Sequence, residues 1–245
     1  MSHVAFSSKD HLPPALPNNI IYVDHHRIAG DVLGLASKKL VRAGYAACGS
    51  IVSKRRNNMK KVVLLGDSIR LIGYGNYVAE ALKDEFTVWQ PEDNCRFASY
   101  TLRMLFDYRP QIEDADIIHW NNGAWDLCRL YEDGDTFTPI EVYCDTLRRI
   151  ASILLKITDK VIFATTTPVR DVNVYNDNET VRAFNEAAIK TLAPMGVKIN
   201  DLYGVVAPDI DGMILDDNIH LNDKAARLCA EKAVQAIREA SGGEV

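Results

Sequence analysis

From about residue 60 onward, short apolar runs alternate with longer segments whose apolar residues recur at helical spacing. The short runs are apolar on both faces, which is typical of strands in a parallel sheet that helices cover on both sides. Strands are predicted at 62–66, 86–90, 115–121, 160–167 and 197–200. Helices are predicted at 74–84, 98–107, 139–157, 177–194 and 222–240, with a helical turn at 201–206.

This alternation predicts an α/β fold, a three-layer α/β/α sandwich around a five-stranded parallel sheet. Ligands bind such sheets at the carboxyl ends of the strands. Polar residues follow four of the predicted strands at that edge: Ser68, Asn94, Asn121 with Asn122, and Thr165–Thr167. The sequence therefore predicts a functional site there.

Residues 1–58 lack this pattern, and proline, glycine and basic stretches interrupt them. They are predicted to be an N-terminal appendage, poorly ordered in part, before a domain of residues 59–245. The appendage carries eight Lys or Arg against three Asp, so the domain is acidic within the net charge of −5. An acidic domain disfavours nucleic acid as a partner. The basic appendage is expected to be a solvated surface, with nucleic acid or membrane binding as the alternative.

Composition adds further expectations for this chain of 245 residues. No apolar stretch approaches the 18 residues of a membrane span, and the N-terminus lacks the pattern of a secretory signal. Five cysteines are scattered without a C-x-x-C pair, which argues against a disulfide framework or a zinc site. We therefore expect a cytoplasmic protein with no metal and no membrane partner.

Ser68 is the first candidate for chemistry, because it follows the strand KVVLL in the stretch GDSIR. It could be a helix N-cap, part of a phosphate loop, or a nucleophile. The stretch lacks G-K-[ST] and a third glycine, which weakens the nucleotide alternative, and it also lacks the G-x-S-x-G elbow.

A nucleophilic serine needs a base, and two histidines lie in the main domain. His119 falls inside a predicted strand, where a structural role is expected. His220 lies in a loop before the last helix, three residues after Asp217. A carboxylate at that spacing can orient the imidazole through Nδ1 and leave Nε2 to take a proton. The alternative is a surface loop in which Asn222 or Asp223 caps the helix.

Together, G-D-S after the first strand and D-x-x-H before the last helix resemble the SGNH, or GDSL-type, hydrolases from Met59 to about Ser241. The resemblance implies a flavodoxin-like fold, acyl transfer through a serine ester, and no cofactor. It gives Ser68 the role of nucleophile, His220 that of base, and Asp217 that of the residue orienting His220.

The SGNH family has several short sequence motifs, or blocks, and this chain departs from the second and the third of them. The third block should read G-x-N-D, but Trp125 stands where the family has asparagine. Asn121 is the favoured replacement as an oxyanion donor, with Asn122 and the Trp125 indole as alternatives.

The second block lacks the family glycine, so the backbone N–H of Arg96 or Cys95 is expected to join the Ser68 N–H in the oxyanion hole. Arg96 could instead pair with a neighbouring acid at the surface. Asp67, Asn94 and Trp125 are expected to contact substrate.

The loops at 127–138 and 168–178 are polar, and no long apolar lid is evident. We therefore expect a small-molecule or carbohydrate ester substrate with a short acyl group such as acetyl. The alternatives are an inactive SGNH-like domain that binds a glycan or small ligand, and a phosphoester- or nucleotide-binding module in which Ser68 is a cap.

Overall fold

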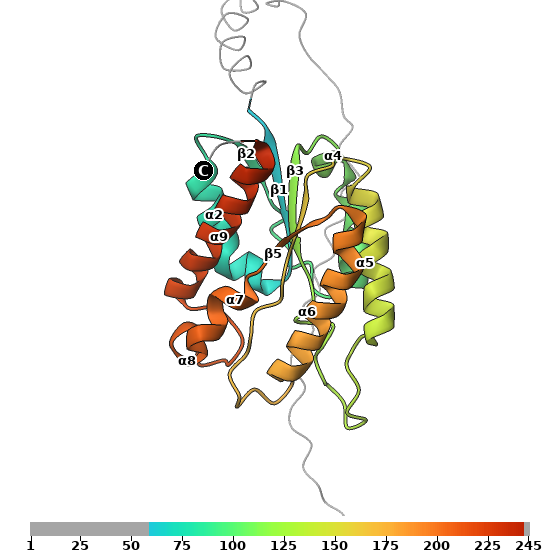
Figure 1. The fold of residues 1–245 in the computed structure, drawn as a ribbon, viewed down its shortest axis with the longest axis vertical. Helices are drawn as coiled ribbons and strands as arrows, with labels where there is room; N and C mark the ends of the chain where they lie inside the picture. The colour runs from blue at the N-terminus through green and yellow to red at the C-terminus, as the bar shows by residue number, and fades with distance from the viewer. Residues whose placement is uncertain (1–58, 243–245) are drawn as a thin grey trace, which may run out of the picture. The chain divides into compact units, whose positions relative to one another are not determined.

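The computed structural model describes residues 59–242, so the predicted appendage at 1–58 lies outside the described residues. Five parallel strands form one sheet in the order β2-β1-β3-β4-β5 (Figure 1). Their bounds are β1 Lys61–Leu65, β2 Thr87–Trp89, β3 Ile117–Asn121, β4 Val161–Ala164 and β5 Lys198–Asn200. Strand β1 lies between β2 and β3, and its Val63 pairs with Trp89 of β2 and Ile118 of β3.

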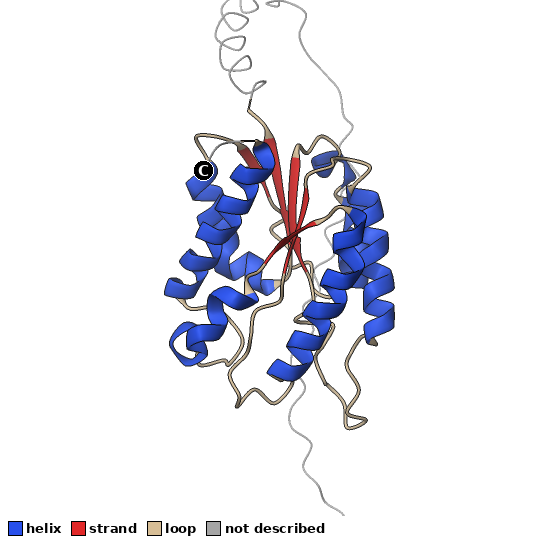
Figure 2. Cartoon of the chain, viewed as in Figure 1, coloured by secondary structure: helices blue, strands red, loops and turns tan. Residues whose placement is uncertain are grey.

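Helices cover both faces of the sheet, which makes three layers (Figure 2). One face carries α2 (Gly75–Leu82), α7 (Tyr203–Val206), α8 (Ile210–Met213) and α9 (Asp223–Ser241). The other carries α3 (Ala98–Asp107), α4 (Arg109–Ile112), α5 (Ile140–Leu154) and α6 (Asn178–Leu192). Three short helical segments complete the described part: η1 (Ile69–Tyr74), η2 (Ala193–Met195) and η3 (Ala207–Asp209). The predicted α/β/α sandwich is confirmed.

Strand alternation builds the two cores. Val62 and Leu64 of β1 belong to the cluster under α2 and α9, whereas Val63 and Leu65 belong to the cluster under α3, α5 and α6. All four are fully or almost fully buried. Successive side chains of a strand point to opposite faces, so a central strand needs apolar residues at every position. This is why the apolar runs identified the strands.

The element bounds agree with the predicted ones to within a few residues, and α3 has the predicted bounds. The largest differences are at two C-terminal ends: α5 ends at Leu154 instead of residue 157, and β4 ends at Ala164 instead of residue 167. The Thr165 N–H still donates to the Asn200 carbonyl of β5 at 3.0 Å, but the Thr166 N–H donates to Asn185 Oδ1 of α6 at 2.8 Å instead of to a strand. The four-residue helices α4 and α8 were not predicted, because one turn has no periodic apolar pattern.

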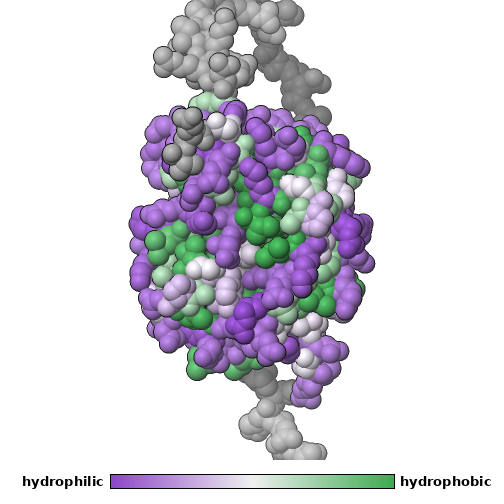
Figure 3. All heavy atoms as spheres, in the orientation of Figure 1, coloured by the Kyte–Doolittle hydropathy of each residue, from purple (hydrophilic) through white to green (hydrophobic). Residues whose placement is uncertain are grey.

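Polar side chains cover most of the face in Figure 3, and apolar ones gather near its middle, where the edge strand β5 runs. Within residues 59–242, no helix has both the length and the apolar character that a membrane span needs. The same residues contain no group of three or more His, Cys, Asp or Glu arranged to hold a metal ion.

Candidate active site

Ser68 lies in the turn between β1 and η1, at the point where the strand order reverses between β1 and β3. It occupies the N-cap position of η1, yet its side chain makes no capping hydrogen bond. The neighbouring Asp67 instead accepts from the Ile69 N–H at 2.9 Å. The partly exposed Ser68 hydroxyl is therefore not used as a cap, which was the main alternative to a catalytic role.

A buried polar network lies below this turn. Asp67 Oδ1 accepts from Asn121 Nδ2 at 2.9 Å, and Asn121 Oδ1 accepts from the Tyr74 hydroxyl at 3.1 Å. Burial raises the pKa of Asp67, and the hydrogen bonds from Asn121 and Ile69 oppose this shift. A Cβ on Gly66 would lie 1.9 Å from Asn121 Oδ1, so only glycine allows this close approach. Asp67 and Asn121 thus hold the turn that carries Ser68 against β3.

The loop before α9 brings Asp217 onto His220. His220 Nδ1 lies 2.7 Å from Asp217 Oδ2, and the His220 N–H donates to Asp217 Oδ1 at 2.9 Å. Partial burial alone would raise the pKa of Asp217, but the hydrogen bonds from His220 and Ile219 lower it below its ordinary value. An ionised Asp217 favours the tautomer with the proton on Nδ1, which leaves Nε2 as a free acceptor. Asn222 caps α9 through the Ala225 N–H at 3.0 Å, so the predicted cap and the Asp–His pair coexist.

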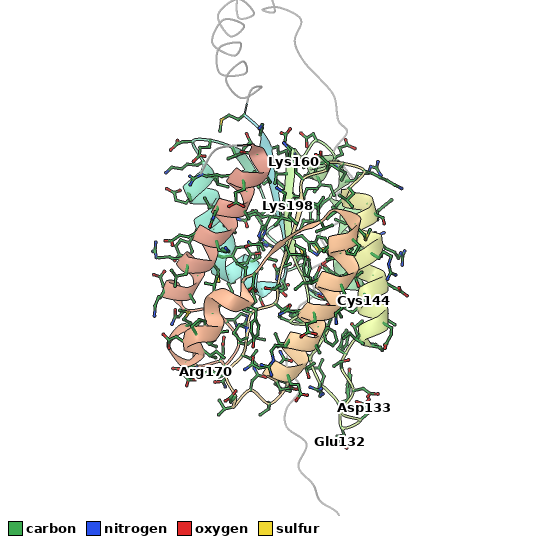
Figure 4. All side chains as sticks on the ribbon, viewed as in Figure 1. Glu132, Asp133, Cys144, Lys160, Arg170 and Lys198 are labelled. Carbon is green, nitrogen blue, oxygen red and sulfur yellow. The ribbon has the colours of Figure 1, made fainter. Side chains whose placement is uncertain are left out.

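Arg170, in the loop after β4, forms hydrogen bonds to residues 211–218, which precede His220 and are called here the histidine loop. Its Nη2 donates to the carbonyl oxygens of Ile214 at 2.6 Å and Asp211 at 3.0 Å, and its Nη1 contacts Asp216 Oδ1 at 3.2 Å. Its backbone N–H also donates to the Asn218 carbonyl at 3.1 Å. Figure 4 labels Arg170 beside α8. No sequence pattern indicated this role, because the partners of Arg170 are mostly main-chain oxygens.

The loop after β2 presents Asn94. Arg96 has φ = 48°, in the left-handed region that glycine prefers. The Arg96 N–H donates to Asn94 Oδ1 at 2.7 Å. Its guanidinium lies 4.7 Å from the centre of the Tyr100 ring, and no ion pair with Glu92 or Asp93 is found in the described part of the chain. The Arg96 N–H thus already has a partner inside the loop.

Buried side chains after β3 connect this loop to the sheet. Asn122 donates to the Arg96 carbonyl at 2.9 Å and accepts from the Trp120 indole at 3.0 Å. Asp126 accepts from the Ala98 N–H at 2.9 Å and so fixes the start of α3. Burial raises the pKa of Asp126 to about 7. Neither residue lines the cavity described next, so both position its walls.

A cavity of about 530 Å³ lies where the turn with Ser68, the loop with Asn94 and the loop with His220 meet. Of the predicted site residues, Ser68, Asn94, Trp125 and His220 line it. No hydrogen bond between the Ser68 and His220 side chains is present within residues 59–242, although catalytic contacts of this kind often tighten only when substrate binds. The rest of the lining is apolar and was not predicted: Leu71, Ile72, Phe97, Ala124, Cys128, Leu130, Phe137 and Ile219.

Asp67, Arg96, Asn121 and Asp217 do not line the cavity. Asp217 contacts His220 Nδ1, and Asn121 donates a hydrogen bond to Asp67. A second cavity, of about 440 Å³, lies between α2 and α9 and contains no serine, cysteine or histidine. The first cavity is therefore the candidate active site.

Comparisons with solved structures agree with this architecture. The acetyl xylan esterase AlAXEase superposes with a TM-score of 0.61 at 16% identity, over 72% of this chain and 99% of that one. A lipase/acylhydrolase from Enterococcus faecalis gives 0.60 at 21% identity, over 74% and 96% of the two chains. The acetylxylan esterase Axe2 from Geobacillus stearothermophilus gives 0.59 at 14% identity, over 76% and 95%. The chain has the SGNH hydrolase fold.

A relative in sequence agrees with this assignment. The chain is 26% identical over 162 residues to the GDSL esterase/lipase WDL1 of Oryza sativa subsp. japonica. The match covers 60% of this chain and 62% of the relative, so it spans less than two thirds of the relative's length. No family model matches the chain. The resemblance to the SGNH or GDSL-type hydrolases that the sequence motifs indicated is confirmed.

Proposed function

We propose that the chain is a carboxylic ester hydrolase of the SGNH type, and that the activity resides in residues 59–245. The observation that carries the proposal is the placement of Ser68 and His220 on one cavity, with His220 Nδ1 2.7 Å from Asp217 Oδ2. Serine, histidine and carboxylate in these roles activate a hydroxyl for attack on an acyl carbon.

In the first half of the reaction, Ser68 Oγ attacks the ester carbonyl carbon while His220 Nε2 takes the hydroxyl proton. The carbonyl oxygen becomes an oxyanion, and collapse of the tetrahedral intermediate expels the alcohol, which receives the proton from His220. In the second half, His220 takes a proton from water, the hydroxide adds to the acyl-serine, and Ser68 regains its proton as the acid leaves. Asp217 stabilises the imidazolium in both halves.

The oxyanion needs hydrogen-bond donors that face the cavity. Ser68 and Asn94 both line the cavity, and the Asn94 Oδ1 accepts from the Arg96 N–H, so we assign the Ser68 N–H and the Asn94 Nδ2 as donors. The predicted donors Arg96 N–H and Asn121 Nδ2 each have a partner within the protein. Either would have to exchange or share that partner to act, so we assign the side-chain contribution to Asn94.

A fluorophosphonate probe tests the proposal, because it forms a stable adduct with an activated serine. Intact-mass and peptide analysis should find one adduct, on Ser68. Labelling should be lost in Ser68→Ala and reduced by about 10²–10⁴-fold in rate in His220→Ala. Ser99→Ala is the matched control, since Ser99 is exposed on α3 and outside the cavity.

Hydrolysis of p-nitrophenyl esters should follow the same order among the variants. A folded protein that is neither labelled nor active would overturn the proposal and favour the alternative of an inactive domain that binds a glycan or small ligand. The acetyl group, the carbohydrate substrate and the cytoplasmic location remain predictions from the sequence.

A further inference from the structure

Two parts of the chain give the cavity apolar walls: η1, which follows the catalytic serine, and the loop after β3. Leu71 and Ile72 follow Ser68 in η1, and Ile72 leaves 64% of its surface in water. Trp125 and Phe137 come from the loop after β3, and each is 40% exposed. Large apolar side chains that remain in water around one concave site indicate a ligand that covers them.

Loops build the second wall, yet hydrogen bonds and ring contacts fix it. The Phe97 and Phe137 ring centres lie 5.2 Å apart, which joins the loops after β2 and β3. The Phe137 N–H donates to the Cys128 carbonyl at 2.7 Å, and the Thr138 N–H donates to the Asp126 carbonyl at 2.8 Å. A wall held in this way loses little conformational freedom when a ligand binds.

The charged residues of the same loop are directed elsewhere. Arg129 donates to Thr180 Oγ1 at 2.8 Å and pairs with Asp177 at the start of α6. Glu132 and Asp133 lie at the tip of the loop, away from the sheet (Figure 4). The acidic residues that made this loop look polar in the sequence are therefore not part of the cavity lining, which receives its apolar Leu130 and Phe137.

We propose that this apolar cavity binds the acyl chain of the substrate, and that the enzyme prefers straight acyl chains of several carbons to acetyl. The inference rests on the proposed esterase function. An acetyl group has one methyl carbon beyond the carbonyl and would leave most of the wall in water. Each further methylene that leaves water for an apolar wall stabilises the bound state, until the chain extends beyond the cavity.

Two ester series test the assignment. In the first, p-nitrophenyl is constant and the acyl group runs from acetate through butyrate and hexanoate to octanoate. We expect kcat/KM to rise by up to about fourfold per methylene as far as hexanoate, which corresponds to about 0.8 kcal/mol for each. In the second, acetyl is constant and the alkyl alcohol lengthens, and kcat/KM should change by less than about threefold across the series.

Phe137→Ala should remove part of the gain, lowering kcat/KM for hexanoate by about tenfold and that for acetate by less than about threefold. Phe106→Ala is the matched control, because Phe106 is also an exposed phenylalanine, 72% in water, but outside the cavity. Phe137→Leu keeps an apolar side chain and should give an intermediate profile, which serves if the alanine variant does not fold.

The outcomes separate this inference from the proposed function. Absence of both Ser68 labelling and hydrolysis overturns the esterase proposal itself. Labelled, active enzyme with a flat acyl series, or with a gain only in the alcohol series, overturns the acyl-chain assignment and leaves the esterase proposal intact. Equal effects of Phe137→Ala and Phe106→Ala on the hexanoate rate also overturn it.

Discussion

The imidazole Nδ1 of His220 lies 2.7 Å from Oδ2 of Asp217, and the same carboxylate also accepts the backbone N–H of His220. One side chain therefore fixes both the ring and the main chain of the proposed base. The geometry has a local origin, because the partners lie three positions apart in the sequence and the loop between them turns at Asn218, whose φ is 69°. A positive φ at asparagine costs less than at most other residues.

Asp217→Asn should lower kcat for ester hydrolysis by about 10²–10⁴-fold, because an amide no longer stabilises the imidazolium and can favour the wrong tautomer. Initial rates with saturating ester measure this effect. Asp216→Asn is the control on the adjacent position, since Asp216 is exposed and contacts Arg170 instead of His220. Similar losses in both variants would mean that the loop as a whole matters and not the Asp217–His220 pair.

Arg170→Ala should lower kcat by about 10- to 100-fold, because the histidine loop loses its clamp and His220 is less well oriented. The free energy of unfolding should fall by about 1–3 kcal/mol as carbonyl oxygens lose their donor. Arg170→Lys should recover part of the activity with a single cationic donor. The Ser68 labelling rate distinguishes the two roles: a purely stabilising Arg170 would lower the melting temperature and leave that rate unchanged.

Asn94 and Asn121 should respond differently to truncation. Asn94→Ala should lower kcat by about 10²–10³-fold with little change in melting temperature, as expected for an oxyanion donor at the cavity surface. Asn121→Ala should lower the free energy of unfolding by about 1–3 kcal/mol, because the buried Asp67 loses its side-chain hydrogen-bond donor and keeps only the Ile69 N–H. Thermal melts and steady-state rates on the same preparations separate the effects. A stable Asn94→Ala enzyme with normal kcat would remove Asn94 from the oxyanion hole.

The free energy of unfolding should depend on the ionisation of Asp126. Burial raises the pKa of this carboxyl from 3.8 to about 7 in the folded protein. The folded state therefore holds a proton that the unfolded state releases between about pH 4 and pH 7. The contribution of Asp126 to the free energy of unfolding is fully present below this window and is lost as the pH rises through it. The loss is at most about 4 kcal/mol.

Urea unfolding at several pH values measures this pH dependence of the free energy of unfolding. In Asp126→Asn the free energy of unfolding should decrease less between pH 4 and pH 7 than in the wild-type protein, because the amide does not titrate. Asp135→Asn, in the exposed part of the same loop, should keep the wild-type dependence. An unchanged pH profile in Asp126→Asn would show that Asp126 ionises normally.

Local pattern was sufficient for most of the architecture. The strands were found because central parallel strands are buried on both faces, and α3 and α9 were found from their periodicity. The four-residue helices α4 and α8 escaped, and β4 proved shorter because α6 supplies Asn185 to the Thr166 backbone. No pattern within the strand could indicate that partner, since it lies on another element.

The site divides in the same way. Asp217 and His220 are neighbours in sequence, so their contact could be predicted from spacing. The partner of Asn121 could not be predicted from alternation alone, because whether its amide faces the cavity or Asp67 depends on how β3 packs beside β1. Arg170 and the apolar wall were missed for a related reason, since their partners belong to separate loops.

The sequence by itself determined the order of strands and helices, the turn that exposes Ser68 and the Asp217–His220 pair, because each depends on residues that are near one another along the chain. Only the tertiary structure decided that Ser68 and His220 share a cavity, that Asn94 and not Asn121 lines it, and that Phe97 and Phe137 form its wall. These relationships depend on how the carboxyl ends of separate strands meet at one edge of the sheet, and no local pattern records that meeting.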